Sequence, residues 1–339
     1  MSNLTCALLP VLLAPFWADE SQARRYEFEQ THMGQPIKIT LYAPDQRTAN
    51  LAADAAYARI AELDATLSDY KPDSELSKLS ATAGSGRAMP LSPDLWTVLA
   101  QSRKLAEQSG GAFDVTVGPY VRLWRRARRN KEFPSGERLE EARRAVGYRK
   151  LKLDNAQHTA ELVAPGMRLD LGGIAAGYAV DQAMAEMRKQ GVTRALIDAS
   201  GDMLASEPPP GEAGWKIGIA PLDAAAPPSR YLRLSNAAVT TSGDAFQHVV
   251  LNGKRYSHIV NPATGLGLID QSSVTVIATD CITADGVATA VSVMGPETGL
   301  KLIESTPHAA AYIVRNVDGR IEQVASERFR GYLAPDKKP

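Results

Sequence analysis

Apolar and polar residues follow two different periods along the first third of the chain. Residues 26–42 alternate with the period of a strand, and the interruption at Met33-Gly34 predicts two strands joined by a tight turn. Residues 50–67 place apolar side chains at helical spacing, so we expect a helix there. A polar loop over 68–80 leads into a short helix, and a further amphipathic helix is expected over 93–108.

The rest of the chain continues this mixture of strands and helices. The clearest unit is 171–190, where an apolar strand end, a glycine-rich turn and a helix follow one another, with Gly191 closing the helix. Asn252-Gly253 between two apolar runs is a strong type I′ hairpin signal. Further strands are expected over 193–198, 246–250, 255–260 and 273–278, and further helices over 284–294, with Thr283 as N-cap, and 296–304.

Strict alternation of strand and helix is missing, which favours an α+β fold with mixed or antiparallel sheets flanked by helices over a doubly wound sheet. We assign residues 24–339 to one domain, and the 44% hydrophobic content is ordinary for a globular protein. Lys plus Arg and Asp plus Glu number 38 each, so no global field attracts a polyanion. We therefore expect no nucleic-acid partner.

Residues 1–23 differ in character from the rest and are interpreted as a signal peptide. The uncharged apolar run Cys6 to Ala18 is short for a bilayer span, and the small-x-small pattern Ser21-Gln22-Ala23 follows it. Met1 to Thr5 lacks the usual Lys or Arg, so a buried first strand or an uncleaved interfacial segment stays an alternative. We expect a periplasmic or otherwise exported protein that begins near Arg24, with association with the membrane left open.

Cysteine and histidine are too scattered for a soft-ligand metal site, so a metal here would be a hard cation held by oxygen. Asp285 and Thr289 are four residues apart, which places both on one face of a helix. Together they offer two oxygens to Mg²⁺, which completes its shell with water, carbonyl and phosphate oxygens. The alternative for Asp285 is simple charge complementarity with the start of the helix.

The strongest single motif is the glycine-rich unit from Asp170 to Asp181. Glycines at a turn before a helix let the backbone approach a ligand, and the helix start offers N–H groups to a pyrophosphate. The Lys-Ser/Thr pair of a P-loop and the G-x-G-x-x-G dinucleotide pattern are both absent. Tight packing of helix on sheet explains such glycines equally well.

Two further loops and one helix carry candidate chemistry. Phe113 and Asp114 lie in a loop that follows a helix. The Asp114 carboxylate would accept hydrogen bonds from a heteroaromatic ring or a ribose, or it would only stabilise the turn. His258 stands at a strand end before a Pro/Gly turn, a setting for a general base or for a histidine that only braces the turn. The arginine-rich run 122–131 is either a solvated helix face or a contact for phosphate or a partner.

Taken in order, these motifs resemble the ApbE family of FAD:protein FMN transferases over about residues 26–304. Eight ordered motifs are far more specific than any one of them. They are the Met33-Gly34 turn, SDYKPDSELSKLS from Ser68, GGAFDVTVGPYVRLW from Gly110, LDLGGIAAGYAVD from Leu169, ASGDMLA from Ala199, TTSGDAFQ from Thr240, YSHIVNPATG from Tyr256 and ADGVATAVSVMG from Ala284.

The resemblance implies a T-fold-like architecture with a flavin cleft between lobes. It also implies that the protein is a Mg²⁺-dependent transferase. Such an enzyme attaches the FMN half of FAD through a phosphoester bond to a Thr or Ser of a target, such as a redox-complex subunit or a flavin reductase-like protein, and releases AMP. His258 would be the base for the acceptor hydroxyl and Asp285 the second catalytic residue, while the backbone oxygen of Gly173, Asp285 and Thr289 would hold Mg²⁺. The FAD site would be lined by Met33, Tyr70, Ala112, Phe113, Asp114, Asp170, Ala176 and Ile259.

Two other functions stay open at this point. Water in place of the acceptor hydroxyl would make the protein an FAD pyrophosphatase that yields FMN and AMP. The family pattern usually has Lys or Glu where Ala176 stands, so a flavin-holding maturation protein without turnover is the second alternative. Asp170 or Asp114 would be the base if His258 is not.

Overall fold

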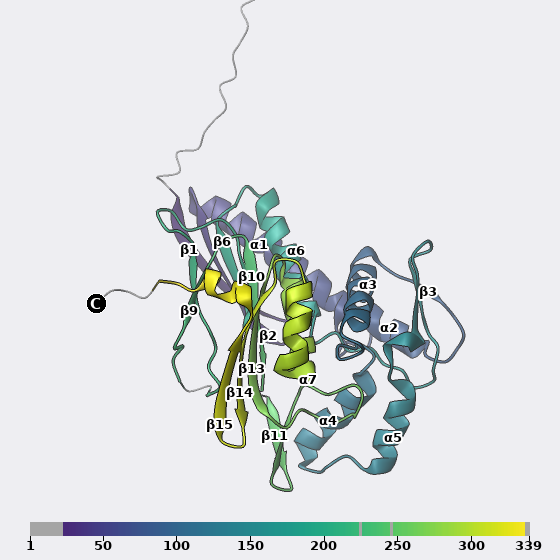
Figure 1. Ribbon diagram of the computed structural model, residues 1–339. Coiled ribbons are helices and arrows are strands. Elements are labelled where there is room, and N and C mark those ends of the chain that lie inside the picture. Colours follow the sequence, from purple (N-terminus) through teal and green to yellow (C-terminus); the bar gives the residue numbers. More distant parts are fainter. Residues whose placement is uncertain (1–22, 224–225, 245–246, 336–339) are drawn as a thin grey trace, which may run out of the picture.

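The computed structural model describes residues 23–223, 226–244 and 247–335, and its centre is one large antiparallel sheet (Figure 1). The sheet has eight strands in the order β1-β2-β6-β7-β10-β13-β14-β15, and every neighbouring pair is antiparallel. The predicted first hairpin is confirmed, because β1 and β2 meet at Met33 (φ 52°) and Gly34 (φ 74°). The strands of the sheet are β1 (Arg24–His32), β2 (Gln35–Ala43), β6 (Ala195–Ala199), β7 (Asp202–Ala205), β10 (Ala237–Gly243), β13 (Gln271–Ala278), β14 (Ala310–Val317) and β15 (Arg320–Ala325).

Both faces of this sheet are covered, and the alternation of side chains in β13 shows it. Val274 and Val276 face the main core, which contains the helices α1 (Gln46–Leu67), α6 (Ala175–Lys189) and α7 (Cys281–Ser305). Ile277 faces a smaller core on the other side, which includes Trp215, Leu232 and Phe329. That core is closed by β8 (Trp215–Gly218), β9 (Tyr231–Leu234) and the 3₁₀ helix η3 (Glu327–Tyr332).

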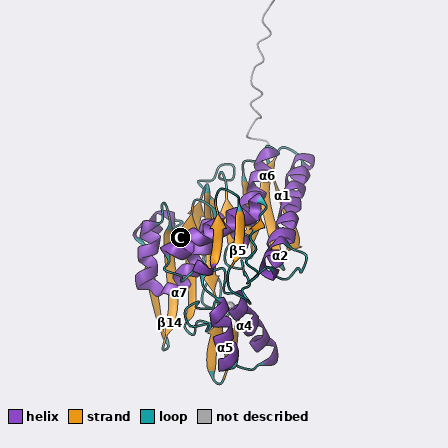
Figure 2. Cartoon of the chain, turned by 90° about the vertical axis from the view of Figure 1, so that its right-hand side faces the viewer, coloured by secondary structure: helices purple, strands orange, loops and turns teal. Residues whose placement is uncertain are grey.

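The remaining elements build a second lobe at the edge of the helical layer, and its lower end holds α4 and α5 in both views (Figure 2). Tyr120 and Trp124 of α4 pack with Val249 of the β11–β12 hairpin in a separate apolar cluster. These elements are α2 (Glu75–Ala81), β3 (Met89–Pro90), α3 (Pro93–Gln108), α4 (Gly118–Asn130), α5 (Gly136–Ala145), η2 (Tyr148–Lys150), β4 (Leu151–Asp154), β5 (Thr159–Leu162), β11 (His248–Leu251) and β12 (Lys254–Ser257). Within the described ranges, no helix is both long and apolar enough to cross a membrane.

The α+β prediction is confirmed, and two local expectations are wrong. Helix α7 begins at Cys281, since the Asp280 carboxylate accepts the Thr283 N–H at 2.9 Å and so caps the helix in place of Thr283. No strand ends at Leu171; residues 169–174 form an irregular turn into α6. The break expected after residue 294 is present, because Gly295 (φ 75°) interrupts α7. The expected signal peptide lies outside the described residues except for Ala23.

Candidate functional site

A cavity of about 320 Å³ between the two lobes gathers most of the side chains that the sequence singled out. Its walls come from the β1–β2 turn, the loops after α1 and α3, helix α4, the turn before α6, the segment after β12, and α7. Ten of the predicted site residues line it, namely Met33, Tyr70, Ala112, Phe113, Asp114, Asp170, Gly173, His258, Ile259 and Thr289. Residues that lie far apart along the chain thus meet at one place.

The glycine-rich turn brings bare backbone to the cavity wall. A Cβ at Gly173 would lie 2.8 Å from the Thr289 Oγ1, a distance that real side chains do not tolerate, so only glycine fits against α7 here. Asp170 Oδ1 accepts the Gly172 N–H at 2.9 Å and fixes the shape of the turn. The turn therefore places the peptide of Gly173 and the hydroxyl of Thr289 side by side.

Asp170 belongs to a charged network that extends to the rim of the cavity. Its Oδ2 accepts from Arg125 at 2.9 Å, and Arg125 also pairs with Asp69. The Arg125 guanidinium lies 4.2 Å from the centre of the Tyr70 ring, which is 72% exposed. Burial raises the pKa of Asp170 and the neighbouring Asp69 raises it further, whereas Arg125 lowers it. Among the residues that the structure describes, Arg125 is the only basic side chain that pairs with either carboxylate.

Asp114 is committed to the shape of its own loop. One carboxylate oxygen accepts the N–H of Thr116 at 2.8 Å and its hydroxyl at 2.7 Å, and the other accepts the Tyr148 N–H at 2.8 Å. Burial raises the pKa of Asp114, and these hydrogen bonds oppose that rise. The arrangement favours the turn-stabilising interpretation of Asp114 and leaves it little capacity to act as a base.

His258 follows β12 and has one ring nitrogen tied to the backbone. The Gln247 carbonyl lies 3.1 Å from His258 Nδ1, and a carbonyl only accepts, so we assign the ring proton to Nδ1. Nε2 then carries the lone pair. Burial lowers the pKa of His258, and the nearby Arg128 lowers it further, so the neutral ring dominates at neutral pH.

Asp285 lies behind the cavity wall and takes part in a reciprocal arrangement of α6 and α7. Its Oδ2 accepts the Gly177 N–H at 3.2 Å near the start of α6. In return, the Asp181 carboxylate of α6 accepts the N–H groups of Cys281 at 2.8 Å and Ile282 at 2.9 Å at the start of α7. A Cβ at Gly177 would come within 2.4 Å of the Cys281 carbonyl oxygen, so the helices cross in close contact. Each helix thus caps the other.

The donors around Thr289 fit a hard divalent cation. Hydroxyl oxygens of Ser242 and Thr289 are 3.4 Å apart, the Gly173 backbone is adjacent, and Asp285 stands one helical turn before Thr289. Burial raises the pKa of Asp285 well above its usual range, and the charge of Asp202 raises it further; a cation would offset both effects. Among the described residues, no group of three or more His, Cys, Asp and Glu side chains gathers as a metal site, so oxygen donors of this other kind are the relevant set.

The cavity wall differs in part from the predicted set of site residues. Ala176 is half-buried in the first turn of α6 and does not line the cavity, and neither does Asp285. Asp69, Arg125 and Gln247 do line it and were not singled out. Their signal was present, since each lies inside a motif that the sequence analysis quoted, or in the arginine-rich run.

Comparisons with known proteins agree with one another. The FAD:protein FMN transferase of Vibrio cholerae is 30% identical over 319 residues, which cover 90% of this chain and 93% of that protein. The FAD:protein FMN transferase of Escherichia coli K12 is 29% identical, with 81% of this chain and 79% of that protein covered. Both relatives thus match over most of their own length.

Solved structures give the same result. The apo form of the Pseudomonas stutzeri flavinyl transferase ApbE has a TM-score of 0.81 at 28% identity, and the match covers 92% of this chain and 97% of that chain. Flavin transferase ApbE from Vibrio cholerae also has a TM-score of 0.81 at 28% identity, covering 92% and 100%. The model of the ApbE family matches residues 33–313, so the chain belongs to the ApbE family.

Proposed function

We propose that this protein is an FAD:protein FMN transferase. The cavity itself carries the proposal. It brings together His258, whose Nε2 carries a lone pair, the glycine turn at Gly173 and the hydroxyl of Thr289. Two relatives that this chain matches over most of their length are named FAD:protein FMN transferase. FAD is the donor, and a protein hydroxyl is the acceptor.

The reaction we propose exchanges the phosphoanhydride bond of FAD for a phosphoester bond to the acceptor. The oxygen of a Thr or Ser hydroxyl attacks the phosphorus of the FMN half, and the bond from that phosphorus to the bridging pyrophosphate oxygen breaks. AMP leaves with the bridging oxygen and its electron pair. His258 Nε2 accepts the hydroxyl proton, which makes the attacking oxygen a better nucleophile. The Gly173 turn orients the pyrophosphate.

Mg²⁺ is part of the proposal, and Asp285, Thr289 and the backbone oxygen of Gly173 are the residues that would hold it. When bound, the ion neutralises charge on the pyrophosphate and on the leaving phosphate. Asp285 is suited to this because its Oδ1 accepts no hydrogen bond from the described part of the chain, while Oδ2 holds α6 in place.

One incubation tests the function against its alternatives. The protein is mixed with FAD, Mg²⁺ and a Thr-containing acceptor, and the products are separated by denaturing gel and chromatography. We expect flavin fluorescence on the acceptor band together with AMP. Free FMN with AMP and no labelled acceptor would indicate a pyrophosphatase, and unchanged FAD would indicate a flavin-holding protein. Chelation with EDTA should stop the transfer, and added Mg²⁺ should restore it.

We also propose that the protein is exported, on the strength of the apolar run and small-x-small site before Arg24. Intact-mass analysis of the mature protein should give a species that begins near Arg24. An active cytosolic species that retains Met1 would contradict this proposal.

A further inference from the structure

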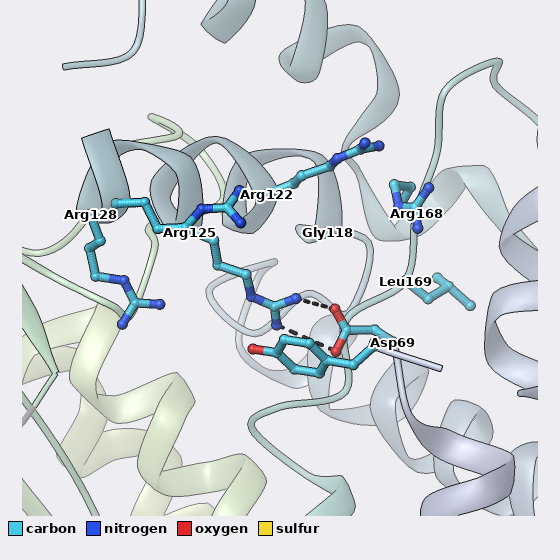
Figure 3. Close-up of a pocket in the computed structure, with 9 residues that line it drawn as sticks. Asp69, Gly118, Arg122, Arg125, Arg128, Arg168 and Leu169 are labelled. Atoms are coloured by element: carbon cyan, nitrogen blue, oxygen red, sulfur yellow. Dashed lines mark hydrogen bonds and ion pairs between the residues drawn. The ribbon is translucent and has the colours of Figure 1, made fainter. Parts of the chain in front are cut away.

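A larger hollow of about 680 Å³ lies along helix α4, beside the 320 Å³ cavity that contains His258, which we call the flavin cavity after its proposed ligand. We call it the arginine groove; it is lined by Asp69, Tyr70, Gly118, Arg122, Arg125, Arg128, Arg129, Arg168 and Leu169. Figure 3 shows Arg128 toward one end and Arg168 toward the other, with Arg125 between them reaching Asp69. The groove therefore concentrates one kind of charge on one strip of surface.

Most of this charge has no counter-charge. Arg125 is compensated, since it pairs with Asp69 and Asp170. Arg122, Arg129 and Arg168 are exposed and form no ion pair with any residue in the described ranges. The whole chain is neutral, with 38 basic and 38 acidic residues, so the groove is a local excess that attracts an anionic partner.

Helix stability alone does not explain the cluster. Arg128 and Arg129 stand in the last turn of α4, where basic residues complement the helix dipole. Arg122 stands earlier in the helix, and Arg168 comes from a different segment. The backbone holds Arg168 there through a parallel bridge to Val117, and a Cβ at Gly118 would lie 2.5 Å from the Arg168 carbonyl oxygen.

The groove leads into the flavin cavity. The two hollows share Asp69, Tyr70, Arg125 and Arg128 in their walls. The Arg128 guanidinium lies 3.5 Å from the side-chain oxygen of Gln247. The backbone carbonyl of Gln247 accepts the hydrogen bond from the His258 ring. A polypeptide that lay in the groove would therefore continue toward His258.

We propose that the arginine groove docks an acidic segment of the acceptor protein, close in sequence to the hydroxyl that receives FMN. This inference rests on the proposed transferase function. Guanidinium groups bind carboxylates through two parallel hydrogen bonds, which gives such a segment both affinity and a fixed direction. A concave strip that opens into the reaction cavity fits a polypeptide better than it fits the flat surface of an anionic membrane.

Two fluorescein-labelled peptides test the proposal by anisotropy. Each has a central Thr, and one carries four Glu on one side where the other carries four Gln. We expect the protein to bind the Glu peptide about tenfold more tightly at low salt, with the preference shrinking as salt rises. The variant Arg122→Glu, Arg129→Glu, Arg168→Glu should lose the preference. The matched control Arg126→Glu, Arg138→Glu, Arg144→Glu changes exposed arginines of α4 and α5 outside the groove and should keep it.

Each outcome has a definite meaning. Equal binding of both peptides, or an unchanged preference in the groove variant, overturns the proposal. Binding to vesicles of phosphatidylserine and phosphatidylcholine through the same arginines, with no peptide preference, would also overturn it and assign the groove to lipid. A Glu peptide that binds the groove but never becomes flavinylated supports docking and counts against the transferase function alone. Unchanged FAD affinity in the groove variant shows that it is folded.

Discussion

The pair of helices behind the wall of the flavin cavity, α6 and α7, which we call the floor, and the rim of the cavity hold their charges in opposite ways. On the floor, Asp181 and Asp285 are enclosed between α6 and α7 and accept hydrogen bonds from backbone N–H groups. On the rim, Arg122 and Arg129 of α4 are exposed, whereas Arg125 is half-buried and held by a pair of carboxylates. A buried charge acts strongly because little solvent screens it, whereas each exposed charge acts weakly and works by number. We therefore expect floor variants to affect the reaction and rim variants to affect recognition.

The largest expected effect comes from Asp285 on the floor. Asp285→Asn should lower FMN transfer by more than about 10³-fold, because the charge proposed to hold Mg²⁺ is lost. The Asn side-chain oxygen still accepts from Gly177, so the melting temperature should change little. Asp285→Ala should also abolish transfer, but it removes the cap of α6 as well and should cost about 0.5–2 kcal/mol of stability. Transfer assays and thermal melts separate the two effects; normal turnover of the Asn variant would remove Asp285 from the metal site.

Replacement of His258 should have the second-largest effect on transfer. Its replacement by Asn removes the proton acceptor, and general-base help is typically worth about 10²–10⁴-fold in rate. FAD affinity, measured by fluorescence titration, should stay nearly constant because other residues bind the nucleotide. Near-normal transfer by the variant would assign the base elsewhere, and Asp170 would then be tested first, since Asp114 is already occupied by its own loop.

The dependence of the transfer rate on pH is a smaller effect, and it tests the role of His258 independently. Because burial lowers the pKa of His258, transfer should decline only as the pH falls through a value below the usual 6.5 of histidine. Above that value the ring is neutral and the rate no longer depends on it. The acid limb should vanish in His258→Asn. A limb of unchanged position in that variant would show that another group titrates.

The smallest effect is expected on the rim, at Tyr70. Its ring is exposed and lies over Arg125, where a cation–π contact contributes little. Tyr70→Ala should raise KM for FAD by about two- to fivefold with kcat nearly unchanged, while Tyr70→Phe keeps the ring and serves as its control. A large loss of kcat in Tyr70→Ala would break the distinction between floor and rim.

Sequence patterns predicted the elements well where local signals were strong. Asn252 and Gly253 both adopt positive φ, as the hairpin signal requires, and helix α3 spans the expected residues 93–108. The cap of α7 was misplaced because Asp280 and Thr283 are both good capping residues, and only the geometry shows that the Asp280 carboxylate meets the Thr283 N–H. The apolar residues before α6 were interpreted as a strand, although tertiary packing and not a sheet buries them.

The site was harder to predict than the fold for a physical reason. Motifs identify residues that are close in sequence, so the Gly173 turn and His258 were found directly. Arg125 was missed because its importance comes from Asp69 and Asp170, which stand 56 and 45 residues away. The role of Asp285 in holding α6 was invisible for the same reason, since its partner Gly177 is 108 residues distant.

The mutual capping of α6 and α7 has a consequence for how the protein opens. Neither helix can unwind at its start without releasing a carboxylate that holds the start of the other. The amide protons of Gly177, Cys281 and Ile282 should therefore exchange with deuterium in a single cooperative event, at a rate far below that of surface loops. We expect such a unit to keep its shape during the reaction, so that ligand entry and exit depend on the loops and on α4, which form other parts of the cavity wall.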